Sequence, residues 1–183
     1  MKGQQTVWLV GMMGAGKSAV GRSLALALGV RFVDSDDEVA RRSGRSVGEI
    51  FKREGEQGFR KRERELIDAV AGEEAIVSLG GGAVSQPGAV DRLAAAGTVV
   101  YLRARTETLL ARIGDARSRP LLANLDEGAR EACLGELIAA RSAANEAAAI
   151  VVDTDDLGVD EVAGRVARRL ADAAERIGKA RRT

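Results

Sequence analysis

The segment Trp8–Gly21 reads WLVGMMGAGKSAVG: an apolar run, then three glycines, a lysine and a serine, then residues suited to a helix. Within it, Gly11–Ser18 (GMMGAGKS) matches the pattern G-x-x-x-x-G-K-[ST] in full. Glycines at these positions permit positive φ angles and let backbone N–H groups surround phosphate oxygens, and the start of the following helix adds partial positive charge. A chance match in a glycine-rich chain is the alternative, but the strand–loop–helix context disfavours it. The segment therefore predicts a binding loop for a nucleoside triphosphate.

Two side chains of this loop are expected to act on the nucleotide. Lys17 would place its charge beside the β- and γ-phosphates, and the hydroxyl of Ser18 would bind Mg²⁺. The predicted nucleotide-binding residues of the loop are Gly11, Gly14, Ala15, Gly16, Lys17, Ser18 and Ala19.

Apolar runs suited to buried strands occur at five places in the chain. They are β-branched and continuous rather than alternating, as in parallel strands that are covered on both faces. The predicted strands are residues 6–10, 31–34, 75–79, 98–102 and 149–153. Helix-period stretches lie between them, at residues 17–28, 59–71, 88–96, 106–112, 127–140 and 159–177, and Ser46–Glu49 (SVGE) has the spacing of a capping box. This alternation predicts a doubly wound α/β sheet with right-handed crossovers.

Composition limits the class of protein. The chain has 183 residues, 45% of them hydrophobic, which favours one domain over residues 1–183, with a core of about 5–172 and a frayed tail of about 178–183. The net charge of +1 gives no general attraction for nucleic acid or an anionic membrane, and no apolar run approaches the roughly 20 residues of a membrane span. The N-terminus has no signal-peptide pattern, and the single cysteine, Cys133, fits a reducing cytoplasm as a small buried hydrophobe. There is no histidine, so catalysis must use carboxylates, arginine, lysine, backbone amides and a hard metal ion.

Unusual residues follow three of the predicted strands, where ligands bind in such sheets. Asp34 and Asp36 are two residues apart and would face the same side of an extended chain, one near a metal and one near an acceptor hydroxyl. A helix N-cap with a surface acid is the alternative. The run Gly80–Gly82 after the third strand favours close approach of a ligand to the backbone, although a tight turn is possible.

Two arginine-bearing stretches are further candidates. Glu56–Glu65 (EQGFRKRERE) has alternating charge typical of a solvent-exposed helix, in which one arginine could point inward and clamp an anion. The residues alone do not choose among Arg60, Arg62 and Arg64. Gly114–Leu122 (GDARSRPLL) is either an ordinary loop or a segment whose arginine closes over the γ-phosphate.

Taken together, GMMGAGKS, FVDSD, GRSVGEIF, GEQGFRKRE, SLGGGAV and RPLL resemble the shikimate kinase family, from about Val7 to about Leu170. The resemblance implies a three-layer α/β/α fold with a parallel sheet in the order 2-3-1-4-5. It also implies a substrate-binding region at about 34–62 and a lid at about 114–126. The implied activity is ATP- and Mg²⁺-dependent phosphorylation of the 3-hydroxyl of shikimate, in the biosynthesis of chorismate and aromatic amino acids. We expect a cytoplasmic monomer that binds ATP and shikimate but neither nucleic acid nor membrane.

The resemblance also assigns individual roles. By it, Asp34 lies near the metal, Asp36 bonds the shikimate hydroxyls, and Arg60 binds the shikimate carboxylate. The glycines meet the substrate through their backbone, Arg119 acts on the phosphates as a lid arginine, and Arg112 flanks adenine. The implied catalytic residues are Lys17, Asp36 and Arg119, the implied substrate-binding residues are Asp36, Arg60, Gly80, Gly81, Gly82 and Arg141, and the implied metal ligands are Ser18 and Asp34.

One segment departs from the family pattern. Where the family has R-x-P-x-Y, this chain has RSAAN, with Arg141 kept but Ala143 and Asn145 in place of proline and tyrosine. We expect weaker binding of shikimate rather than a different substrate. The alternatives are a kinase of the same fold acting on gluconate or a similar acid, and a nucleotide-binding module without catalysis.

Overall fold

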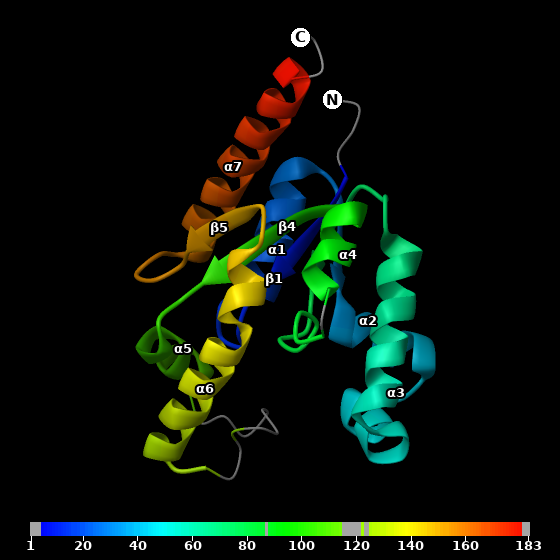
Figure 1. Cartoon of the computed structure of the whole chain (residues 1–183), viewed down its shortest axis with the longest axis vertical. Coiled ribbons are helices and arrows are strands. Elements are labelled where there is room, and N and C mark those ends of the chain that lie inside the picture. The colour runs from blue at the N-terminus through cyan, green and yellow to red at the C-terminus, as the bar shows by residue number, and fades with distance from the viewer. Residues whose placement is uncertain (1–4, 87, 115–121, 123–124, 181–183) are drawn as a thin grey trace.

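The computed structural model describes residues 5–86, 88–114, 122 and 125–180, in which strands alternate with helices (Figure 1). The strands are β1 (Thr6–Val10), β2 (Arg31–Asp34), β3 (Ala75–Ser78), β4 (Gly97–Arg103) and β5 (Ile150–Asp153). The helices are α1 (Lys17–Leu28), α2 (Ser35–Ser43), α3 (Val47–Val70), α4 (Ala89–Ala96), α5 (Thr106–Ile113), α6 (Glu127–Glu146) and α7 (Val159–Ala180). None of the helices in these described ranges is both long and apolar enough to cross a membrane.

All neighbouring strands pair in parallel, in the order β2-β3-β1-β4-β5. This is the order implied by the family resemblance, and the five predicted strands lie within one residue of the observed ones at each end. The register aligns Asp34 at the end of β2 with Ser78 at the end of β3. Since parallel strands end at one edge of the sheet, the loops after β1, β2 and β3 lie next to one another.

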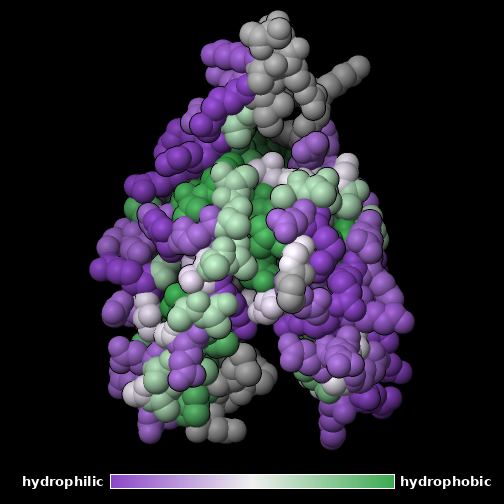
Figure 2. All heavy atoms as spheres, in the orientation of Figure 1, coloured by the Kyte–Doolittle hydropathy of each residue, from purple (hydrophilic) through white to green (hydrophobic). Residues whose placement is uncertain are grey.

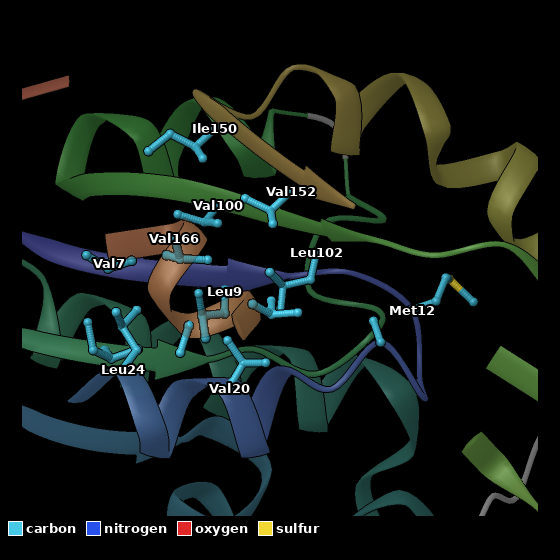
Figure 3. Packing of buried hydrophobic residues seen from close by; sticks show 14 of the residues in the cluster. Val7, Leu9, Met12, Val20, Leu24, Val100, Leu102, Ile150, Val152 and Val166 are labelled. Carbon is cyan, nitrogen blue, oxygen red and sulfur yellow. The ribbon is translucent and has the colours of Figure 1, made fainter. Parts of the chain in front are cut away.

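Alternate residues of each strand point to opposite faces and build two halves of the core. Val7 and Leu9 of β1 join a cluster with Leu24 of α1 and Val166 of α7 (Figure 3). Trp8, also on β1, is fully buried in a second cluster, made with residues of α3 and α4. The sheet is therefore covered on both faces, which explains why its strands read as continuous apolar runs.

The helices differ from the sequence prediction around the sheet's second strand. Residues 35–43 form α2, with Asp34 as its N-cap, so Asp36 stands in a helix and not on an extended chain as predicted. The capping box at Ser46–Glu49 is present and opens α3, which begins well before the predicted start at residue 59. α3 is bent at Gly55, where φ is 69° and ψ is −175°.

Two helices near the C-terminus are longer than predicted. α6 continues to Glu146 rather than ending at residue 140, and it therefore carries Arg141. α7 continues to Ala180, so residues 178–180 are helical and not part of a frayed tail.

Candidate active site

The loop after β1 has the backbone shape that its sequence predicts. Gly11, Gly14 and Gly16 have φ angles of 142°, 81° and 88°, a region that residues other than glycine rarely adopt. Lys17 Nζ donates hydrogen bonds to the carbonyl oxygens of Gly11 (2.9 Å) and Met12 (3.0 Å). The ammonium group of the lysine is thus held against the backbone of the loop itself.

The glycines also let other segments pack against this loop. A Cβ atom on Gly11 would stand 2.5 Å from the carbonyl oxygen of Leu102, and one on Gly14 would stand 3.0 Å from Ile113 Cγ1. Within the loop, Ala15 is buried, whereas Ala19 is exposed on the first turn of α1. The loop therefore touches β4 and α5, the elements that lead to Arg112.

Ser18 and Asp34 meet although they lie in different elements. Ser18 Oγ donates a 2.6 Å hydrogen bond to Asp34 Oδ2 and lies 3.3 Å from Ser78 Oγ. Oxygen donors of this kind suit Mg²⁺, which is commonly held by one or two carboxylates together with substrate phosphates. No cluster of three or more His, Cys, Asp or Glu side chains suited to a metal occurs in the described part of the chain.

Asp36 lies beside this pair, in the first turn of α2. Its backbone N–H donates to Asp34 Oδ1 at 3.2 Å, and its own Oδ1 is buried without a hydrogen-bond partner in the structure. Burial raises the pKa of Asp36, and the charge of Asp34 raises it further, while Lys17 and Arg60 oppose the shift. A carboxylate of this kind is suited to accept a hydrogen bond or a proton from an incoming hydroxyl.

The loop after β3 leaves room for Asp36 and Arg60. A Cβ atom on Gly80 would stand 2.7 Å from Asp36 Oδ1, and one on Gly82 would overlap the Arg60 guanidinium. The N–H of Gly80 donates to Ser35 Oγ at 3.0 Å, which ties the loop to the start of α2. The φ angles of Gly80, Gly81 and Gly82 are not in the left-handed region. The glycines are thus explained by close approach of side chains, rather than by a strained turn.

Arg60 is the arginine of α3 that points toward this loop. Its Nη1 donates a 2.8 Å hydrogen bond to Glu63 Oε2, and the Glu63 side chain is only 4% exposed. Arg62 instead pairs with Glu54, and Arg64 is exposed and donates to Gln86. The geometry therefore separates the three arginines that the residue pattern left equivalent.

Arg141 reaches the loop Gly80–Gly82 after β3, called the glycine loop from here on, from α6. Its Nη1 donates to the carbonyl oxygen of Gly81 at 2.7 Å and lies 3.6 Å from Met12 Sδ. Burial lowers the pKa of Arg141, and the nearby charge of Arg60 lowers it further. Two guanidinium groups that repel each other across one loop favour an anion between them.

Arg112 lies farther along the same edge of the sheet. Its guanidinium donates to Thr154 Oγ1 at 2.9 Å and to the carbonyl oxygen of Thr154 at 2.5 Å, just after β5. Arg119 falls outside the described residues, as does most of the predicted lid at 114–126.

Sequence reasoning missed Glu63, which it placed among the charges of a solvent-exposed helix face. Burial raises the pKa of Glu63, against the opposing effect of Arg60, and its Oε1 has no hydrogen-bond partner in the structure. Its spacing of three from Arg60 is the one signal that could have found it.

These groups follow neighbouring strands at one edge of the sheet. Figure 2 shows the surface recessed between the part formed by α5 and α6 and the part formed by α2 and α3. The site combines a loop of the G-x-x-x-x-G-K-[ST] pattern, a hydroxyl–carboxylate pair beside it, a partly buried carboxylate and two arginines. This combination defines a P-loop phosphotransferase whose acceptor is a small anionic molecule.

Comparison with known proteins narrows this class. The family described as Shikimate kinase matches residues 13–171. Shikimate kinase 1 of Yersinia pestis (strain Pestoides F) is 40% identical over 171 residues, covering 93% of this chain and 98% of that protein. The solved structure of shikimate kinase from Acinetobacter baumannii in complex with shikimate has a TM-score of 0.84 and 35% identity, over 93% of this chain and 94% of that one. This chain belongs to the shikimate kinase family.

A gluconokinase from Sinorhizobium meliloti 1021 also matches in structure, with a TM-score of 0.61 and 17% identity over 94% of this chain and 95% of that one. At that identity the likeness shows a common fold alone.

Proposed function

We propose that this protein transfers the γ-phosphoryl group of ATP to the 3-hydroxyl of shikimate, giving shikimate 3-phosphate and ADP. The bond between the γ-phosphorus and the β,γ-bridging oxygen breaks, and a bond from the shikimate oxygen to that phosphorus forms. The hydroxyl proton leaves to a nearby base.

One observation carries this proposal. Arg60 and Arg141 come from different helices and face the glycine loop from two sides, while Asp36 borders the same loop at Gly80. This arrangement suits a compact acceptor that has a carboxylate at one end and hydroxyl groups at the other. Shikimate has that chemistry, and membership in the shikimate kinase family supports it as the substrate.

On the nucleotide side, we assign phosphate binding to the backbone amides of Gly11–Ser18 and to Lys17. The lysine would exchange its bonds to the loop carbonyls for bonds to the β- and γ-phosphates. Ser18 and Asp34 would hold Mg²⁺, which supplies charge neutralisation at the phosphate oxygens when bound. Arg112 would flank the adenine, and Arg119 would act on the phosphates from the lid.

On the acceptor side, we assign the carboxylate of shikimate to Arg60 and Arg141. Asp36 would then orient the 3-hydroxyl and take its proton, since its unpartnered Oδ1 is held near the loop. Most of the rate enhancement would come from positioning and charge stabilisation, because phosphoryl transfer needs little covalent help from the protein.

Three finer features belong to the proposal. The chain acts as one domain whose acceptor region is about 34–62 and whose lid is about 114–126. It acts as a monomer, since one chain contributes the nucleotide and the acceptor groups described above. It works in the cytoplasm, which the single cysteine of its sequence fits.

Steady-state assays that couple ADP release to a spectroscopic signal test the proposal, with shikimate, gluconate and nucleoside monophosphates as separate acceptors. We expect turnover with shikimate at a kcat/KM at least about 100 times that with either other acceptor. Turnover confined to gluconate would replace the substrate. Tight binding of ATP without turnover of any acceptor would instead favour a nucleotide-binding module.

A further inference from the structure

α3 contains two glycines that the active site itself does not use. At Gly55 the backbone leaves the helix, with φ of 69° and ψ of −175°, a region that is essentially restricted to glycine. At Gly58 a Cβ atom would overlap the Cβ of Glu54. Both glycines are therefore needed for the same purpose, which is to fold residues 47–54 back against residues 56–70.

Two side-chain contacts close this bend. Arg62 Nε and Nη2 donate to the two carboxylate oxygens of Glu54 at 2.9 and 2.8 Å, a bidentate pair that is partly buried on both sides. The rings of Phe51 and Phe59 stack with their centroids 4.8 Å apart. Arg45, which precedes α3, also contacts Glu54 at 3.4 Å. The ion pair and the ring pair each join one half of α3 to the other.

The bend matters for Arg60, which lies between Glu54 and Arg62 in the sequence. It stands in the early turns of the second half of α3, and its guanidinium lies 5.4 Å from the ring of Phe59. Residues 60 and 62 are about 200° apart around a helix, so they point to opposite sides. A bond that holds Arg62 to the first half of α3 therefore fixes the rotation that aims Arg60 at the glycine loop.

We infer that Glu54 and Arg62 are positioning residues for the acceptor. They hold the bend of α3 so that Arg60 faces the glycine loop and is ready for the acceptor carboxylate. This inference rests on the proposed function. It assigns neither residue a contact with substrate.

Kinetics of paired variants test this inference. We expect Arg62→Gln and Glu54→Gln each to raise KM for shikimate about tenfold. KM for ATP should stay unchanged within about twofold, because these substitutions displace Arg60 but not the nucleotide-binding loop. Arg62→Lys should fall between, since lysine cannot form the bidentate pair. The exchange Glu54→Arg with Arg62→Glu should recover much of the affinity that Arg62→Gln loses.

Lys61 and Glu65 provide a matched control in the same helix. Their ion pair is long, at 4.0 Å, and both side chains are more than half exposed. Lys61→Gln should therefore leave both KM values unchanged.

Each result separates the inference from a merely structural role. If Arg62→Gln lowers the melting temperature but leaves KM for shikimate at the wild-type value, or raises both KM values equally, the inference is wrong. Absence of shikimate turnover in the wild type would instead overturn the proposed function, and the role assigned to this pair with it.

Discussion

The Ser18 hydroxyl donates a 2.6 Å hydrogen bond to the carboxylate of Asp34, and so joins the start of α1 to the end of β2. The two residues are 16 positions apart in the chain: Asp34 ends β2, and Ser18 lies in the helix that follows β1. The bond brings a hydroxyl and a carboxylate together beside the phosphate-binding loop. Asp36, two residues beyond Asp34, donates its backbone N–H to the same carboxylate and borders Gly80.

Asp34→Asn tests the metal assignment. Asparagine also caps helices well, so α2 should keep the cap that Asp34 gives the N–H of Asp36, while a negative charge beside Ser18 is lost. The Mg²⁺ concentration that gives half the maximal rate should rise about tenfold, measured by titrating Mg²⁺ at saturating substrates. An unchanged Mg²⁺ dependence would remove Asp34 from the metal site.

Asp36→Asn should lower kcat by about 10² to 10³-fold, because asparagine cannot take the proton of the acceptor hydroxyl. Binding of ATP should be largely kept, as measured by calorimetry, because the phosphate-binding loop is unchanged. A variant that retains wild-type kcat would show that Asp36 plays no part in the proton transfer.

The same variant should be more stable than the wild type at neutral pH. Burial raises the pKa of Asp36 above its ordinary value of 3.8, so the ionised carboxylate costs the folded state free energy once the pH exceeds that raised value. The neutral asparagine avoids this cost, and its advantage should disappear as the pH falls below 3.8, where both states of the wild type are protonated. Thermal unfolding at pH 7 and at pH 3.5 should therefore show a smaller advantage of the variant at the lower pH. An equal difference in melting temperature at both pH values would contradict this account.

Arg60→Lys should raise KM for shikimate about tenfold or more and leave KM for ATP nearly unchanged. Lysine keeps the charge but loses the planar pair of donors that a carboxylate prefers. Arg64→Lys is the control, since Arg64 lies on the same helix, is exposed and bonds only Gln86 among the hydrogen bonds described above. Equal effects of the two substitutions on KM would argue against a specific acceptor contact at Arg60.

Lys17→Met should lower kcat/KM for ATP about 10²-fold or more, because it removes the point charge expected at the β- and γ-phosphates. Circular dichroism should show an intact fold, since methionine is similar in length and apolar. Undiminished kcat/KM for ATP would contradict the role given to this lysine.

The sequence alone predicted the sheet well but not the region around α2 and α3. Buried parallel strands carry a strong signal in continuous β-branched runs, and β1, β2 and α1 lie where that signal put them. The start of α2 at Ser35 was missed because DSDDEV fits both an extended pair of acids and a helix cap. The lengths of α3 and α6 were underestimated because glycine and alanine weaken the apolar period.

The site shows the same limit. The helical period could not choose among Arg60, Arg62 and Arg64, because charged residues alternate in sign all along this part of the helix. Glu63 was taken for a surface charge for the same reason. Arg141 lies in RSAAN, which lacks the family's proline and tyrosine, and its guanidinium donates to the carbonyl oxygen of Gly81. Whether shikimate binds more weakly as a result stays a prediction.

A crystal structure with shikimate and ADP bound tests the central claim most directly. The account predicts that the shikimate carboxylate contacts both Arg60 and Arg141, while Asp36 lies within hydrogen-bond distance of the 3-hydroxyl and that hydroxyl faces the phosphates. Shikimate seated away from the glycine loop, or turned so that its carboxylate meets neither arginine, would contradict it.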